Sequence, residues 1–335
     1  MKILSASETD LETAARALRE GKLVAIPTET VYGLGANAFD ERAVARVFEA
    51  KARPTFDPLI VHIARTEDVR QVAREVPERA LALARALWPG PLTMILPKKP
   101  EVPDIVTAGL DTVAVRFPSH PVAQHIIELA GIPVAAPSAN PFGYISPTTA
   151  AHVAAMLGDR IDFIVDGGPC DVGVESTVLD LTGREPVLLR AGGMPLERIE
   201  AVVGPVRIPP RQAATVGAAS LASPGQTLSH YAPSTPLYLF ELGSLPGALA
   251  GAAMPHPSLA LVYDSQRAAV LESTGRFDEV VALSPGGNLG EAAARLFSLL
   301  HSFDARHFEA IYAERVPEEG LGRAINDRLF RASKK

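Results

Sequence analysis

Apolar positions follow two different periods along the first 190 residues, and the period distinguishes predicted helices from predicted strands. Four of them recur at helical spacing and predict a helix over 10–20: Leu11, Ala14, Ala15 and Leu18. The apolar run over 23–26 is short and continuous, which is typical of a buried strand. The same patterns predict helices over 40–51, 78–88, 122–129 and 148–157, and strands over 59–63, 92–96, 112–116, 133–136, 163–165, 176–181 and 187–189.

In this first region strands outnumber helices, and several strands follow one another without a helix between them. A strict alternation of strand and helix would indicate a purely parallel sheet, whereas this order favours a mixed one. The expected fold class is therefore α/β, with a mixed twisted sheet and flanking helices over residues 1–204.

The pattern changes after Gly204. Between 205 and 233 proline and glycine interrupt the chain repeatedly, which is typical of a linker between domains. From 234 to 335 strands alternate with helices, so a smaller Rossmann-like parallel α/β domain is expected. Its predicted strands cover 237–240, 259–263, 280–283 and 310–312, and its helices 245–252, 266–272, 289–303 and the end from 323. It lacks a Gly-x-Gly-x-x-Gly fingerprint, so no dinucleotide site is expected there.

Composition narrows the function classes. The chain has 335 residues, enough for two domains, of which 47% are apolar and 21% charged, as in ordinary globular proteins. Its net charge of −6 argues against a protein whose main task is to hold nucleic acid, because that needs an excess of Lys and Arg. A single cysteine, Cys170, excludes an intramolecular disulfide and a cysteine-rich zinc site. Neither a signal peptide nor an apolar run of about 18 residues is present, so we expect a cytoplasmic protein without a membrane partner.

Polar segments framed by proline and glycine stand where apolar, strand-like runs stop. They are Pro27-Thr-Glu-Thr-Val-Tyr-Gly-Leu-Gly35, Lys51-Ala-Arg-Pro54, Trp88-Pro-Gly-Pro-Leu-Thr93, Pro137-Ser-Ala-Asn140 and Gly173-Val-Glu-Ser-Thr177. Loops at strand ends are where α/β proteins gather their binding groups. Because these loops carry hydroxyls, amides and cations but no cysteine or metal cluster, they predict a pocket for a charged, phosphate-bearing ligand.

Each of these signals also has a simpler structural explanation. Lys51 and Arg53 could complement a helix dipole at the surface, although the prolines around their loop favour a phosphate clamp. A lone strand histidine such as His62 is most often a core residue, whereas Arg116, at the end of an apolar strand, needs a carboxylate or a ligand anion. The chain has no P-loop and no Gly-x-Ser-x-Gly elbow, so neither the common ATP site nor a serine hydrolase is expected.

Taken together, the motifs resemble those of the YrdC-like family of threonylcarbamoyl-AMP synthases. The resemblance runs from about Leu11 to Gly193, and the extra α/β domain after Ser223-Pro-Gly225 and His230-Tyr-Ala-Pro233 is similar to the family's long two-domain form. It implies a nucleotidyltransferase that makes threonylcarbamoyl-AMP and pyrophosphate from L-threonine, bicarbonate and ATP. A downstream tRNA threonylcarbamoyl transferase machinery would then modify adenosine 37 of tRNAs that read ANN codons.

Matched position by position, the resemblance implies two sets of binding residues. L-Threonine would contact Thr30, His62, Arg116 and Ser176. ATP would contact Lys51, Arg53, Asp57, Thr112, Ala136, Ser138, Asn140, Ser146, Arg190 and Tyr231. Lys51 and Arg53 would be catalytic because they neutralise phosphate charge, together with a magnesium ion carried by ATP rather than by protein side chains. No general base is assigned, and His62 is the nearest candidate.

The sequence departs from the family's usual pattern in three places. Ala52 replaces a usual Gly, Asp57 replaces a usual Asn, and Gln226-Thr227 replaces Met-Lys. The segment 223–233 is expected to order over ATP. The alternative from another class is a non-catalytic double-stranded RNA or tRNA-binding module on the same fold, and a weak tRNA contact also fits the synthase.

Overall fold

The computed structural model describes residues 1–210 and 231–334, which form two compact units. The first unit comprises Met1–Phe142, Ser146–Asp171 and residues 175–210, and the second comprises Gly143–Ile145, Val172–Val174 and residues 231–334. Two short segments from the first 204 residues belong to the second unit, which the apolar pattern did not predict. Most of the predicted linker, 211–230, lies outside the described residues.

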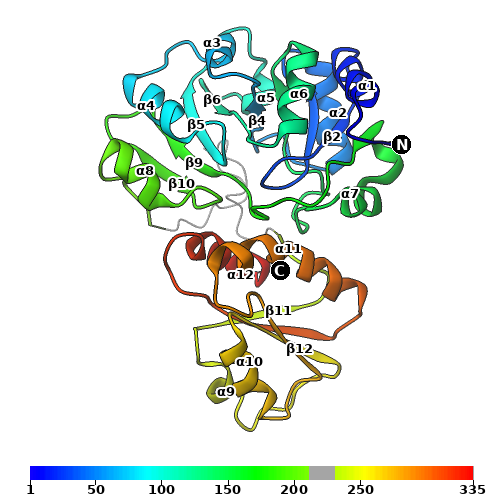
Figure 1. Ribbon diagram of the computed structural model, residues 1–335, viewed down its shortest axis with the longest axis vertical. Coiled ribbons are helices and arrows are strands. Elements are labelled where there is room, and N and C mark those ends of the chain that lie inside the picture. The colour runs from blue at the N-terminus through cyan, green and yellow to red at the C-terminus, as the bar shows by residue number, and fades with distance from the viewer. Residues whose placement is uncertain (211–230, 335) are drawn as a thin grey trace. The chain divides into compact units, whose positions relative to one another are not determined.

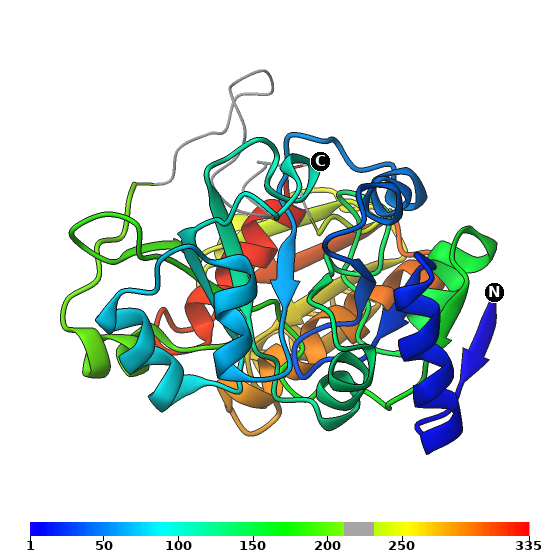
Figure 2. The ribbon, with the colours of Figure 1, turned by 90° about the horizontal axis from the view of Figure 1, so that it is seen from above.

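The strands of the first unit are β1 (Lys2–Leu4), β2 (Val24–Ile26), β3 (Gly33–Asn37), β4 (Ile60–His62), β5 (Leu92–Pro97), β6 (Thr112–Arg116), β7 (Val134–Ala135), β8 (Phe163–Val165), β9 (Thr177–Asp180) and β10 (Val187–Arg190). Within the described residues they form one ten-stranded sheet in the order β1-β8-β2-β3-β7-β4-β6-β5-β9-β10. Parallel and antiparallel pairs alternate irregularly, so the predicted mixed sheet is confirmed. Strand β1 lies at the edge, beside the N-terminus (Figure 2).

The helices of this unit are α1 (Glu8–Arg19), α2 (Glu41–Lys51), α3 (Val69–Val72), α4 (Glu78–Leu87), α5 (Asp104–Thr107), α6 (Pro121–Ala130), α7 (Ala150–Leu157) and α8 (Leu196–Val203), with short 3-10 turns at Thr66–Asp68 and Gly158–Arg160. Helix α2 begins where the pattern predicts a helix, because Asp40 Oδ1 caps it by accepting hydrogen bonds from the backbone N–H groups of Arg42 and Ala43. Helices α3, α5 and α8 were not predicted.

Helices cover the two faces of this sheet unequally. On one face, α2, α4, α7 and α8 bury their apolar sides against alternate strand residues such as Val61 and Val115. On the other face, α1 and α6 pack over β2 and β7. Further along that second face, β4, β6, β5 and β9 contribute a separate small apolar cluster to which none of these helices adds a residue: Ile60, Ala114, Ile95 and Val178. This part of the sheet face is where the candidate site lies.

Strand β3 runs through the end of the first polar motif, which we expected to be a loop. Its residues Gly33 and Gly35 pair with Ile26 and Val24 of β2. A Cβ atom on Gly35 would lie 3.0 Å from Val134 Cγ1, so only glycine lets these strands and α1 approach so closely. The motif therefore combines a turn with a tightly packed strand.

The second unit is a parallel α/β fold, as predicted. Its strands β11 (Leu237–Phe240), β12 (Ser258–Val262), β13 (Glu279–Ala282) and β14 (Ala310–Glu314) form a parallel sheet in the order β11-β14-β12-β13. Its helices are α9 (Leu245–Ala248), α10 (Ser265–Glu272), α11 (Leu289–Ala305) and α12 (Gly322–Ala332). Figure 1 shows α11 and α12 on one side of this sheet and α9 and α10 on the other. No helix in the described part of the chain has the length and apolarity needed to cross a membrane.

The C-terminal cap of α2 shows what one departure from the family pattern costs. Ala52 adopts a left-handed conformation with φ of 50°, which glycine tolerates and alanine does not favour. The strained cap fixes the turn between Lys51 and Arg53.

We therefore expect Ala52→Gly to raise the free energy of unfolding by about 1 kcal/mol, because it removes the left-handed strain. Ala50→Gly is the matched control inside the same helix, where glycine should destabilise by about 1 kcal/mol. Urea unfolding of both variants measures this difference. Equal effects of the two substitutions would contradict the account of the cap.

Candidate functional site

A row of polar residues crosses three neighbouring strands of the first unit. His62 ends β4 and lies in register with Arg116, which ends β6; Arg116 is in turn paired with Thr93 of β5. Residues in register on adjacent strands point to the same face of a sheet. Thr93 Oγ1 lies 2.8 Å from Ser176 Oγ, so Ser176 joins the row from the segment before β9.

The loop after β2 approaches the same row. Glu29 Oε2 lies 2.8 Å from Arg116 Nη2, and both side chains are almost fully buried. Its neighbour Thr30 is completely buried, with Oγ1 2.8 Å from Thr28 Oγ1. Three of the four residues predicted to bind threonine, His62, Arg116 and Ser176, are thus brought together at one end of the sheet face, and Thr30 directly follows the Glu29 that contacts Arg116.

Burial sets the charge states at this end. It lowers the pKa of His62 to about 3, and the positive charge of Arg116 adds to this effect. Burial also tends to raise the pKa of Glu29, but the Arg116 guanidinium outweighs it and holds that pKa below its usual value. At neutral pH the row therefore contains a neutral imidazole next to a carboxylate–guanidinium pair.

Lys51 contacts a second group of residues that were predicted to bind ATP. Its Nζ donates hydrogen bonds to the backbone carbonyl of Ser138, at 2.5 Å, and to that of Asn140. Burial and the nearby Arg53 hold the pKa of Lys51 well below its usual range, against the opposing effect of Asp57. The lysine thus connects the end of α2 to the Pro-Ser-Ala-Asn loop.

Arg53 is buried and supports its own loop, so it is not the surface cation of the simpler structural explanation. Its guanidinium forms an ion pair with Asp57 at 3.0 Å and donates to the carbonyls of Asp57 and Pro58 at 3.2 and 3.0 Å. Burial raises the pKa of Asp57, although Arg53 and Lys51 oppose this shift. Asp57, the residue that replaces the usual Asn, therefore acts first as the partner of Arg53.

Thr112 and Ala136 lie near these two groups. Ile60 of β4 is in register with Ala114 of β6, so Thr112, two residues earlier, lies level with Pro58. The N–H of Ala136 donates to the carbonyl of Ile60 at 2.9 Å, so Ala136 lies between the Arg116 row and the Lys51 group.

A third group of contacts surrounds Ser176. Arg190 donates from Nε and Nη2 to the Ser176 carbonyl, at 3.1 and 3.0 Å, and from Nη2 to Ser176 Oγ at 3.2 Å. Ser146 Oγ donates to Glu175 Oε1 at 2.5 Å. A Cβ on Gly192 would clash with the backbone from Glu175 to Thr177, so this glycine allows the close approach that positions Ser176.

Tyr231 belongs to the second unit, and its predicted contact with ATP stays a prediction. Its ring is buried, 5.7 Å from the Phe297 ring and 5.2 Å from the Arg328 guanidinium carbon. Its φ is 62°, a conformation that is uncommon outside glycine.

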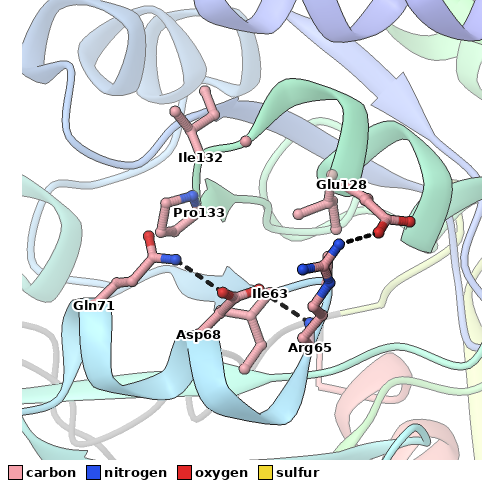
Figure 3. Close-up of a pocket in the computed structure, with 10 residues that line it drawn as sticks. Ile63, Arg65, Asp68, Gln71, Glu128, Ile132 and Pro133 are labelled. Atoms are coloured by element: carbon pink, nitrogen blue, oxygen red, sulfur yellow. Dashed lines mark hydrogen bonds and ion pairs between the residues drawn. The ribbon is translucent and has the colours of Figure 1, made fainter.

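A pocket elsewhere in the first unit does not include any predicted site residue. Figure 3 shows Arg65 directed toward Glu128 and Gln71 toward Asp68. Arg65 and Glu128 form an ion pair, and Gln71 Nε2 donates to Asp68 Oδ1 at 2.9 Å. Because these polar groups bind one another and are exposed, this pocket is a weaker candidate than the sheet face.

The two units match two family profiles. Residues 16–192 match the family described as "Telomere recombination", and residues 194–334 match "Threonylcarbamoyl-AMP synthase, C-terminal domain". The threonylcarbamoyl-AMP synthase of Pyrococcus abyssi is 47% identical over 97% of this chain and 94% of its own length. That of Bacillus subtilis is 44% identical over 98% of this chain and 94% of its own length. The chain belongs to the threonylcarbamoyl-AMP synthase family.

A solved structure of this family extends the likeness to three dimensions. The crystal structure of P. abyssi Sua5 complexed with L-threonine superposes with a TM-score of 0.85 at 43% identity, covering 99% of this chain and 98% of that one. The family resemblance inferred from the motifs is thus confirmed over the full chain.

Sequence reasoning missed three polar residues of this threonylcarbamoyl-AMP synthase site. Glu29, Thr93 and Glu175 all lie within the quoted motifs, but no role was given to them. The available signal for Glu29 was the unpaired Arg116, which needed a carboxylate. Nothing in the sequence indicated that Thr93 would meet Ser176.

The pKa of His62 leads to a test of its burial. Unfolding restores the ordinary pKa of about 6.5, so below that pH the unfolded chain gains a proton that the folded one excludes down to about pH 3. Stability should therefore fall as the pH falls. Between pH 7 and 5 the wild type should lose about 2 kcal/mol more than His62→Gln, because that variant lacks the titrating group.

Urea unfolding of both proteins at pH 7, 6 and 5 measures the difference. The other seven histidines are common to both proteins, so they provide the internal control. Parallel pH profiles would show that His62 is accessible to protons in the folded state.

Proposed function

We propose that the chain is an L-threonylcarbamoyladenylate synthase, which makes threonylcarbamoyl-AMP and pyrophosphate from L-threonine, bicarbonate and ATP. The observation that carries this proposal is one sheet face with an arginine row at one end and buried cations at the other. A strand rises about 3.3 Å per residue, so Thr112 and Arg116 at the two ends of β6 are roughly 13 Å apart. This span suits an amino acid held in line with a nucleotide phosphate. The L-threonine complex of the P. abyssi relative supports the amino-acid half.

The chemistry requires positioning rather than a protein nucleophile. The amino group of threonine loses the proton of its ammonium form to solvent and combines with bicarbonate to form a carbamate with loss of water. A carbamate oxygen then displaces pyrophosphate from the α-phosphorus of ATP. Arg116 would bind the substrate carboxylate, and Thr30, His62 and Ser176 would bind its remaining polar atoms. Holding the reactants in line and balancing their negative charge are the main contributions expected of such a site.

Lys51 is suited to respond to the nucleotide. Its pKa is depressed by burial, and a phosphate group beside it would favour the charged ammonium form. Nucleotide binding and protonation of Lys51 would then be coupled. Arg53 and Arg190 would add their guanidinium charges to the field at the phosphates.

Magnesium is proposed to arrive with ATP. Among the described residues, no group of three His, Cys, Asp or Glu side chains could hold a metal ion. Asp57, the carboxylate beside Lys51, already pairs with Arg53. These residues fit a magnesium ion that phosphate oxygens and water hold, which is how Mg²⁺ commonly binds, and there it would neutralise phosphate charge.

The remaining parts of the proposal concern partners. We place the enzyme in the cytoplasm, where its product passes to a separate tRNA threonylcarbamoyl transferase machinery and a weak contact with tRNA can occur. The RNA-binding module is less well supported, because RNA backbones need exposed cations, whereas Lys51, Arg53 and Arg116 are buried.

The proposal predicts that the purified chain releases pyrophosphate from ATP only when both L-threonine and bicarbonate are present. Neither substrate alone can form the carbamate that attacks ATP. A coupled pyrophosphate assay with degassed buffer, and with L-valine replacing L-threonine as the control, measures this. Release that is independent of threonine would contradict the proposal.

A pair of variants separates the structural and nucleotide roles of Arg53. Arg53→Ala alone should destabilise the first unit by about 3–5 kcal/mol, because Asp57 is left buried without its partner. Adding Asp57→Asn should restore much of this stability but not ATP use, since a lost phosphate contact weakens nucleotide binding by about 1.5–3 kcal/mol. Melting temperature and nucleotide titration report the two effects separately. ATP affinity that recovers together with stability would mean that Arg53 only supports its loop.

A further inference from the structure

Glu29 is a buried carboxylate to which the proposed reaction has given no role. It is 5% exposed and lies between the two threonines of the first motif. Its ion-pair partner is Arg116, at 2.8 Å from Oε2. Neither Glu29 oxygen accepts a well-aligned hydrogen bond among the described residues, but the Arg116 guanidinium and the backbone N–H groups of Glu29 and Ser119 lie close enough to lower its pKa.

The hydrogen-bond donors of Arg116 are also poorly satisfied. Its Nε reaches the Gly90 carbonyl at 3.4 Å, which is a long hydrogen bond, and its Nη2 has no well-aligned acceptor among the described residues. A buried ion pair is stabilising only when its remaining donors and acceptors are also satisfied. Glu29 and Arg116 therefore form a buried pair whose mutual contact is poorly aligned, so each keeps hydrogen-bonding capacity that is available to a ligand.

Three ionisable groups near Glu29 are neutral at pH 7, whereas Glu29 is ionised. His62 is neutral because burial lowers its pKa to about 3, and burial raises the pKa of the Cys170 thiol to about 12. Burial also lowers the pKa of His120 below its usual value. Polar groups that surround a bound amino acid must match a carboxylate with a cation and an ammonium with an anion.

We infer that Glu29 binds the α-ammonium group of the amino-acid substrate while Arg116 binds its α-carboxylate. Glu29 is then a specificity-determining residue, which rejects hydroxy acids that have the shape of threonine but no amino group. This inference rests on the proposed function for the identity of the substrate. The competing explanation is that Glu29 only holds Arg116 in place.

A ligand pair separates the two explanations. (R)-3-Hydroxybutyrate is L-threonine without its amino group, and it keeps the carboxylate and hydroxyl. Binding of both ligands to the full chain is measured by ligand-observed NMR, for the wild type and for Glu29→Gln, which keeps the side-chain shape. Glu128→Gln, which breaks an exposed ion pair in the same unit, is the matched control and should change neither affinity.

The wild type should bind L-threonine roughly 10- to 100-fold more tightly than (R)-3-hydroxybutyrate, as expected for one charge-assisted contact. Glu29→Gln should weaken threonine binding by a similar factor and change binding of the hydroxy acid by less than about threefold. Equal weakening of both ligands would overturn the inference and leave Glu29 as a support for Arg116. Unchanged threonine binding would overturn it as well.

The wild-type comparison keeps the test valid if Glu29→Gln does not fold, because equal affinity of the wild type for both ligands contradicts the inference by itself. The pyrophosphate assay is independent of this result. A wild type that distinguishes the two ligands but releases no pyrophosphate would refute the proposed function and not the role of Glu29.

Discussion

The parallel register between β4 and β6 is the constraint on which the candidate site depends. It pairs Ile60 with Ala114 and His62 with Arg116, so that all four side chains point to one face. A slip of β6 by one residue against β4 would move Arg116 into the helix-covered core and turn Val115 to the other face. Val61 and Val115 are fully buried under the helices of the opposite face, and their burial opposes the slip. The apolar core of one face thereby sets the positions of the polar groups on the other.

The buried charges of the candidate site are explained better by ligand binding than by stability. Glu29–Arg116 and Asp57–Arg53 are ion pairs with almost no exposed side-chain surface. Desolvation of such pairs often equals or exceeds their attraction, so an apolar replacement of similar volume can be as stable. Groups that are already positioned and desolvated, however, need no rearrangement when a charged ligand arrives. The site therefore resembles a preorganised electrostatic environment more than a structural brace.

Much of the fold could be predicted from the sequence, and the exceptions have local causes. The helix after Asp40 and the strand over 112–116 were predictable because period, cap and apolar run agree there. Strand β3 was not, because Gly33 and Gly35 indicate a turn unless the close approach of Val134 and Ala136 is known. The meeting of Thr93 with Ser176 and of Glu29 with Arg116 depends on sheet register, which is a property of tertiary structure. The assignment of residues to threonine or ATP came from resemblance and stays a prediction.

The cations of the site also show why motif recognition alone does not define a residue's role. Lys51, Arg53 and Arg190 each donate hydrogen bonds to backbone carbonyls of loops that carry other predicted binding residues. Lys51 fixes the loop of Ser138 and Asn140, and Arg190 fixes Ser176. A cation in such a position contributes to ligand affinity twice, through its own charge and through the geometry of the loop that it holds. These two contributions are not additive, because removing the side chain also displaces the neighbouring contacts. The Lys-x-Arg motif at the end of α2 is consequently as much a requirement of loop architecture as of phosphate recognition.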